Sequence, residues 1–168
     1  MTTESTEITN GLRRRLLGGL ITGGGLVALG KTTASVAGDP DQSAMPGDEP
    51  RHKVVYQFNH AEPEYHDHVL GSVGAMLRQY QDDIRIVVTC FAQGIHILAK
   101  NPQRPVAADI RERVSSLAMY GVEFHACGRT LASLNWGPDD LLPFAKIVSV
   151  GAADLMELQE QNYAYIVW

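Results

Sequence analysis

One cysteine, Cys127, is the residue of this sequence with the clearest capacity for chemistry. It follows the apolar run 122–126 and precedes Gly128, where a short strand is expected to give way to a helix. Backbone N–H groups and the helix dipole at such a position favour an anion, so they lower the pKa of a thiol and raise its nucleophilicity. The local pattern predicts a reactive thiolate. The alternative interpretation is a small buried hydrophobe.

Two side chains close to Cys127 are candidates for stabilising that thiolate. His125 lies two residues earlier, and therefore on the same face of the expected strand. Arg129 lies two residues later, in the expected helix. A positive charge on either side chain would favour the ionised form of the sulfur.

Alternating apolar runs and amphipathic stretches follow from residue 52 onward. Runs of β-branched and aromatic residues predict five strands, at 53–58, 84–90, 122–126, 146–150 and 163–167. Apolar residues at helical spacing predict helices at 62–81, 105–120 and 152–161, with shorter ones at 94–100 and 129–134. Strands separated by helices require crossover connections. The fold class is therefore α/β, a mostly parallel five-stranded sheet with helices on both faces.

Three strand ends carry polar or small residues that are candidates for a shared pocket. In an open parallel sheet the carboxyl ends of the strands line the ligand crevice. The residues placed there are Asn59 and His60, then Cys90, then Cys127 with Gly128. Within the expected domain at 52–168, a Gly-x-Gly-x-x-Gly turn after the first strand and a Gly-Lys-Ser/Thr loop are both absent, so we expect no nucleotide and no other cofactor.

The two cysteines, Cys90 and Cys127, raise the question of a disulfide. In the usual doubly wound order the first strand lies between the second and the third. The two alpha carbons would then be about 10 Å apart, beyond the ~7 Å limit for a bridge. We therefore expect separate thiols, with Cys90 packed at the edge of the core.

The histidines invite a metal hypothesis, which their spacing does not favour. His60, His66 and His68 lie within nine residues. His66 and His68 are two apart on an expected helix and point roughly 200° from each other. We expect solvated surface side chains and no metal site, and we expect His96 to be packed or to cap a helix.

The first 37 residues have the layout of a secretory signal peptide. A polar start precedes Arg13-Arg14-Arg15, a glycine-rich and weakly apolar stretch covers 16–29, and small residues end at Ala37. The segment 13–17 resembles the twin-arginine export signal. We expect cleavage after Ala37, a periplasmic protein, and no stable membrane anchor, because the apolar stretch is shorter than the ~20 residues that span a bilayer. Residues 38–51, rich in proline and acids, are expected to form a flexible linker before a domain at 52–168.

Charge restricts the class of partner. The first 37 residues hold four of the 14 basic side chains and two of the 19 acidic ones, so the remainder is more acidic than the whole chain at −5. No basic patch remains, and nucleic acid is therefore not an expected partner. Two cysteines are too few for a disulfide scaffold.

Two segments of the expected domain resemble one known family. The run 120–131 is similar to the segment around the reactive cysteine of the DsrE/DsrF-like family, and 147–166 is similar to that family's ending, where a helix rich in Leu and Gln leads to a terminal strand. The resemblance covers 52–168. It implies a flavodoxin-like sheet, a trimeric or hexameric homo-oligomer, and a sulfur relay in which Cys127 accepts sulfur as a persulfide. Cys90 matches no characteristic cysteine of the family.

Two classes of function follow. In the first, the exported protein is a persulfide carrier or sulfurtransferase that works through Cys127 with a donor or acceptor protein. In the second, it is a non-catalytic oligomeric module whose crevice, lined by Asn59, Cys90 and Cys127, holds a small ligand or a partner. An oxidising periplasm counts against a free thiolate, but reduced sulfur compounds are also processed outside the cytoplasm.

Overall fold

The computed structural model describes residues 49–168. The expected signal peptide at 1–37 and residues 38–48 of the expected linker lie outside the described residues. Within 49–168, no helix is both long and apolar enough to cross a bilayer.

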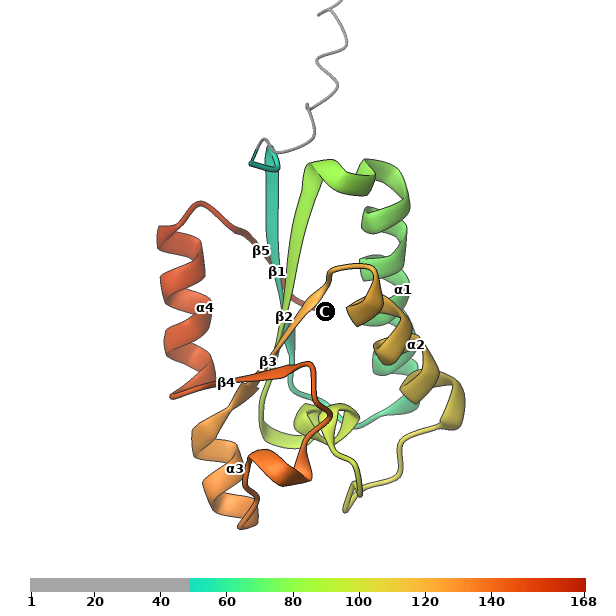
Figure 1. The fold of residues 1–168 in the computed structure, drawn as a ribbon, viewed down its shortest axis with the longest axis vertical. Helices are drawn as coiled ribbons and strands as arrows, with labels where there is room; N and C mark the ends of the chain where they lie inside the picture. Colours follow the sequence, from blue (N-terminus) through green and yellow to red (C-terminus); the bar gives the residue numbers. More distant parts are fainter. Residues whose placement is uncertain (1–48) are drawn as a thin grey trace, which may run out of the picture. The chain divides into compact units, whose positions relative to one another are not determined.

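A sheet of five parallel strands forms the centre of the described domain (Figure 1). Its strands are β1 (His52–Phe58), β2 (Ile84–Cys90), β3 (Glu123–Cys127), β4 (Ala145–Val148) and β5 (Ala164–Ile166), in the order β4-β3-β2-β1-β5. The predicted α/β class is confirmed. The first strand was expected to lie between the second and the third. This order is wrong, because β2 lies between β1 and β3. Successive crossovers place β2, β3 and β4 on one side of β1, and only the last connection returns to the other side.

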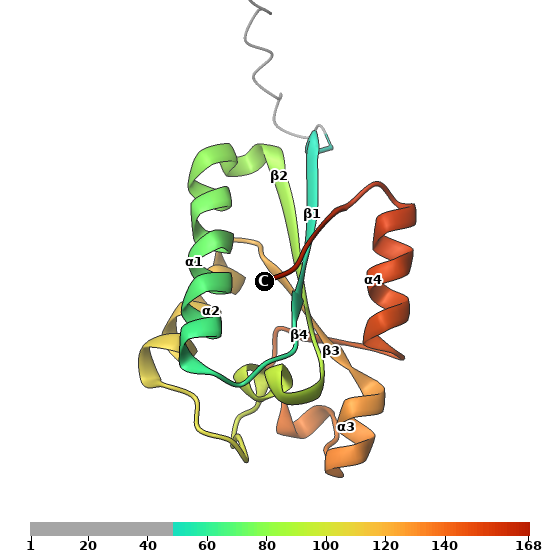
Figure 2. The ribbon, with the colours of Figure 1, turned by 180° about the vertical axis from the view of Figure 1, so that it is seen from behind.

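Helices cover both faces of the sheet (Figures 1 and 2). One face carries α1 (Pro63–Tyr80) and α2 (Ala108–Met119), and the other carries α4 (Gly151–Glu160). A short helix, α3 (Gly128–Leu134), follows directly after β3. Three 3-10 segments complete the described elements, namely η1 (Gln81–Asp83), η2 (Ala92–Leu98) and η3 (Pro138–Asp140).

The alternation of side chains along β3 decides which face receives the candidate thiol. Phe124 and Ala126 are buried in the main core, with residues of α1 and α2. Successive residues of a strand point to opposite faces. His125 and Cys127 therefore project to the face that α4 covers.

The carboxyl ends of β1 and β2 are covered by the backbone of η2. The Phe91 N–H donates to the Phe58 carbonyl oxygen at 3.0 Å. A Cβ placed on Gly94 would lie 2.4 Å from that same oxygen, closer than real contacts allow. Main-chain atoms therefore fill the space where a crevice was expected above these two strands.

Two glycine substitutions test this packing. Gly94→Ala should lower the free energy of unfolding by about 1–3 kcal/mol, because the new methyl group overlaps backbone. Gly71→Ala is the matched control: this α1 glycine has nothing within 4 Å of an added Cβ, and the change should stabilise the protein by about 0.4–1 kcal/mol. Urea unfolding measures both. A Gly94→Ala protein as stable as the parent would contradict the close approach.

Candidate functional site

The Cys127 thiol lies against the first residue of α4. Cys127 ends β3 and immediately precedes α3. Its Sγ accepts a hydrogen bond from the Gly151 N–H at 3.1 Å, across a sequence separation of 24 residues. The sequence pattern places a helix after the cysteine. The structure adds the N-terminus of a second, longer helix from the end of the chain.

Glycine at position 151 permits this approach. A Cβ there would lie 3.1 Å from Cδ1 of Phe91 and 3.3 Å from Cβ of Cys127. Both distances are tighter than ordinary van der Waals contact, so a larger residue would push the start of α4 away from the thiol.

Opposing effects act on the pKa of Cys127. The side chain is 5% exposed, and burial raises the pKa. The Gly151 N–H, the Thr130 hydroxyl and the backbone of Thr130 and Arg129 lower it by more, so it lies below its ordinary value of 9.0. The Thr130 Oγ1 also accepts the Ala92 N–H at 3.2 Å, which leaves its hydrogen for the sulfur. Arg129 acts through its backbone, while its side chain is exposed.

His125 belongs to a different cluster from the one expected. Its ring is buried, and Nδ1 lies 2.9 Å from both carboxylate oxygens of Asp154 on α4. The Thr89 hydroxyl of β2 donates to Asp154 Oδ2 at 2.7 Å. None of the hydrogen bonds found in residues 49–168 joins His125 to Cys127. His125 therefore holds Asp154 directly, and its electrostatic effect on the thiolate stays a prediction.

The Asp154 carboxylate is stabilised in its charged form by this cluster. Burial raises the pKa of the carboxyl, but the hydrogen bonds from His125 and Thr89 outweigh it, and the pKa lies below the ordinary 3.8. Sequence reasoning missed this residue, because its partner His125 is 29 residues away. The available signal was an acid beside the apolar Leu155 on the inward side of an amphipathic helix.

Asn59 and His60 form their own cluster at the end of β1. The Tyr65 hydroxyl accepts the Asn59 N–H at 3.3 Å and donates to the Gln57 carbonyl oxygen at 2.9 Å. The exposed His60 ring packs against Tyr65, with centroids 4.9 Å apart. No hydrogen bond or ring contact found in residues 49–168 joins Asn59 or His60 to Cys127, and β2 lies between their strands.

Cys90 lies on the other face of the sheet. It is fully buried in the main core, and burial raises its pKa well above 9.0. It pairs in register with Ala126, so its strand is adjacent to that of Cys127. The two thiols are both free. They are kept apart because their side chains project from opposite faces of the sheet. The expectation that another strand lies between them is wrong.

The histidines of α1 differ from the solvated pair that was expected. His66 is buried, stacks on Phe58 with centroids 5.2 Å apart, and places Nε2 3.1 Å from the His60 carbonyl oxygen. Burial lowers its pKa. His68 is exposed. His96 is packed edge-on against Trp136, at 5.0 Å. No group of three or more His, Cys, Asp or Glu in the described part of the chain is arranged to hold a metal ion.

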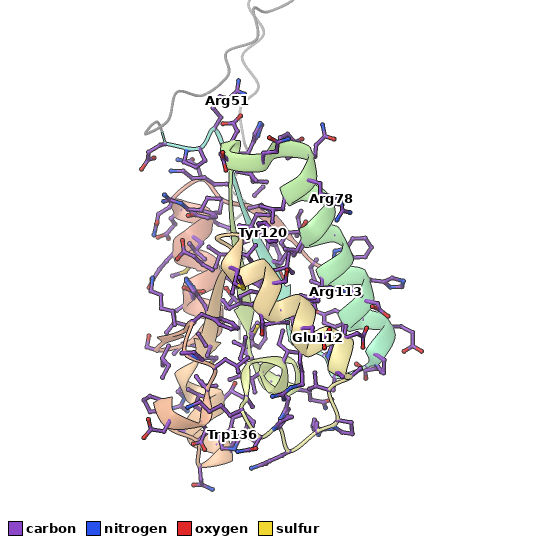
Figure 3. All side chains as sticks on the ribbon, turned by 45° about the vertical axis from the view of Figure 1, so that its right-hand side comes forward. Arg51, Arg78, Glu112, Arg113, Tyr120 and Trp136 are labelled. Carbon is purple, nitrogen blue, oxygen red and sulfur yellow. The ribbon has the colours of Figure 1, made fainter. Side chains whose placement is uncertain are left out.

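A separate hollow of about 860 Å³ lies between α1 and α2. Leu70, Leu77 and Leu117 contribute its apolar lining, and charged side chains accompany them. Figure 3 shows Arg78, Glu112, Arg113 and Tyr120 along these two helices. Because α1 and α2 cover the sheet face opposite α4, this hollow is distinct from the thiol site.

The fold and the site define an all-parallel α/β domain with a buried, hydrogen-bonded thiol at the end of its third strand. The sequence model of the DsrE/DsrF-like family matches residues 42–168, and the chain belongs to that family.

Two solved structures share this fold. A protein of unknown function, MTH1491 from Methanobacterium thermoautotrophicum, is 25% identical, with a TM-score of 0.62 over 70% of this chain and 99% of that one. The ychN protein from E. coli is 12% identical, with a TM-score of 0.55 and the same coverage. The second likeness bears on the fold alone. No curated protein matches the chain in sequence.

Alkylation by iodoacetamide should distinguish the two thiols. Because the thiolate is the reactive form, the rate at Cys127 should fall as the pH drops through a midpoint below that of the same cysteine in urea-unfolded protein. Cys90 should stay unlabelled in the folded protein. Peptide mass spectrometry over a pH series measures both, and urea-unfolded protein, in which both thiols label alike, is the control. Equal labelling of the two cysteines in the folded protein, or a Cys127 midpoint no lower than that in the unfolded protein, would contradict the assignment.

Proposed function

We propose that this member of the DsrE/DsrF-like family carries sulfane sulfur as a persulfide on Cys127. The observation that carries the proposal is the hydrogen bond from the Gly151 N–H to Cys127 Sγ, in a setting that lowers the pKa of the thiol. Membership of a sulfur-relay-like family supports the same role for the residue. A carrier needs a stabilised thiolate, because the thiolate is the form that attacks a sulfane sulfur.

The transfer is an exchange between thiols with no net oxidation. The Cys127 thiolate attacks the outer sulfur of a donor persulfide, R–S–SH. A new S–S bond forms at Sγ, the donor S–S bond breaks, and R–S⁻ leaves, so the products are Cys127–S–SH and a thiolate. An acceptor thiolate then attacks the outer sulfur of Cys127–S–SH, and the Cys127 thiolate is restored.

The crowding around Cys127 favours a small adduct. The thiol is 5% exposed, and both Phe91 and Cys127 stand close to the Gly151 backbone. One added sulfur atom requires little new space, whereas a bulky disulfide adduct would require Phe91 or the first turn of α4 to move. The site is therefore better suited to sulfur transfer than to stable conjugation with a large thiol.

The proposal extends to location and assembly. The arginine run at 13–15 and the small residues before the cleavage position support export by the twin-arginine route, followed by work in the periplasm. Large apolar side chains on the described surface support a homo-oligomer. These include Met119, Tyr120 and Trp168, which are 88%, 72% and 58% exposed.

A second candidate function is a non-catalytic binding module built on the same scaffold. The low exposure of Cys127 favours it, because a buried cysteine often serves only as a small hydrophobe. The two candidates differ in whether Cys127 accepts sulfur.

Sulfur loading separates them. The protein lacking residues 1–37, incubated with inorganic polysulfide, should gain the mass of one sulfur atom on Cys127, and a thiol acceptor should remove it. Cys127→Ser should abolish the gain, while Cys90→Ser is the matched control and should retain it. Intact-protein and peptide mass spectrometry measure the product. An unmodified Cys127, or equal loading of both cysteines, would contradict the carrier proposal.

A further inference from the structure

We propose that Asp154 is a positioning residue for the hydrogen bond between the Gly151 N–H and Cys127 Sγ. Its carboxylate is hydrogen-bonded to His125 and Thr89, and these bonds fix the first turn of α4 to the sheet. This inference rests on the proposed function only for the biological role of the Cys127 thiolate. Its test measures the ionisation of Cys127 and does not depend on sulfur transfer.

Hydrogen bonds form a continuous path from the sheet to the thiol. The carboxylate of Asp154 accepts hydrogen bonds from Thr89 Oγ1 at 2.7 Å and His125 Nδ1 at 2.9 Å, which link it to β2 and β3. The Asp154 N–H donates to the Val150 carbonyl oxygen at 3.0 Å. Val150 immediately precedes Gly151, whose N–H meets Cys127 Sγ at 3.1 Å. The segment before Gly151 is also held, because Val148 pairs with Cys127 and the Arg129 N–H donates to the Ser149 carbonyl oxygen at 3.2 Å. Asp154 adds the restraint on the helix side of Gly151.

Other contacts of α4 act further along the helix. Leu155 and Leu158 pack with Val55 and Val87 in a small core of their own. These apolar contacts are non-directional, so they hold the helix on the sheet without fixing its position along its axis. The hydrogen bonds to the Asp154 carboxylate are directional and act in the first turn. They are suited to place one N–H group on one sulfur atom.

Stability alone is a weak reason for this cluster. Replacing a buried ionic group by apolar residues of similar volume is often neutral or stabilising. The cluster also leaves one polar atom unsatisfied: His125 Nε2 is buried without a hydrogen-bond partner among the described residues, and its nearest carboxylate oxygen, on Glu123, is 3.7 Å away. A geometric role explains why a carboxylate is placed here.

A positioning role and a direct charge effect of Asp154 predict opposite changes in the pKa of Cys127 when Asp154 is replaced. The charged and titratable groups around the cluster are His125 and Glu123 from β3, Lys146 from β4 and Asp154 itself, while Arg129 of α3 is exposed. If Asp154 acted on Cys127 only through its negative charge, removing that charge would lower the pKa of the thiol. If it positions Gly151, removing it weakens the N–H contact and raises the pKa.

The experiment measures the pH midpoint of Cys127 alkylation by iodoacetamide in a Cys90→Ala background. Asp154→Ala and Thr89→Val should each raise the midpoint by about one pH unit, a roughly tenfold loss of thiolate at a fixed lower pH. Thr89→Val keeps the side-chain shape and lacks the hydroxyl, so it tests the cluster with all charges retained. Thr89→Ser and His125→Asn restore a donor at the required position and should stay near the parent value.

Leu158→Ala is the control for general loosening of α4. It removes packing at the far end of the helix, and should lower the free energy of unfolding while leaving the midpoint unchanged. A midpoint that falls or stays constant in both Asp154→Ala and Thr89→Val would overturn the inference. So would a Leu158→Ala midpoint that rises as far as theirs. Failure of polysulfide loading would reject the carrier proposal without altering these midpoints, so the two ideas fail separately.

Discussion

The hydrogen bond between the Gly151 N–H and Cys127 Sγ is the interaction on which the rest of the site depends. It joins the end of β3 to the start of α4, two segments 24 residues apart in the chain. After burial, which raises the pKa of Cys127, this hydrogen bond has the largest effect and lowers it, and the Thr130 hydroxyl and the backbone of Thr130 and Arg129 add to the lowering. At Cys90 burial raises the pKa well above its ordinary value. Both cysteines are buried, but only Cys127 has hydrogen-bond donors that outweigh the effect of its burial on the pKa.

Topology brings this pair of atoms together. From β1 to β4 each new strand is added on the same side of the sheet, with α1 and α2 on one face (Figures 1 and 2). The chain then crosses the other face through α4, and β5 pairs beside β1. The returning helix begins just after β4, the neighbour of β3. Its first residues therefore lie over the carboxyl end of β3. Alternation along β3 turns Cys127 towards that face, and the absence of a side chain at Gly151 lets the backbone approach.

Much of the fold was predictable from the sequence, because local patterns encode it. The five apolar runs and the helical spacings between them predicted the order of strands and helices, and the position of Cys127 at a strand end followed from the same patterns. The order of strands in the sheet was not predicted, since it depends on which crossover reverses direction. His66 was misassigned to solvent, because its place on the inward face of α1 is set by packing against Phe58.

The partners in the site were the least predictable part. Thr89, His125 and Asp154 come from three different elements. Of these only His125 was a candidate from the sequence, and it was paired with Cys127 rather than with Asp154. Asn59 and His60 were grouped with Cys127 on the assumption that all strand ends share one crevice, whereas η2 fills the space above β1 and β2 with backbone. Pairings of this kind depend on register and on tertiary packing, neither of which a single sequence displays.

A titration followed by nuclear magnetic resonance tests the central claim most directly. In a Cys90→Ala protein, the amide proton of Gly151 should shift as the pH rises, because its acceptor changes from a thiol to a thiolate. The account predicts that this shift has the same midpoint as ionisation of Cys127, below that of the cysteine in the unfolded protein, and that Cys127→Ser abolishes it. A Gly151 amide that does not respond while Cys127 ionises would contradict the account.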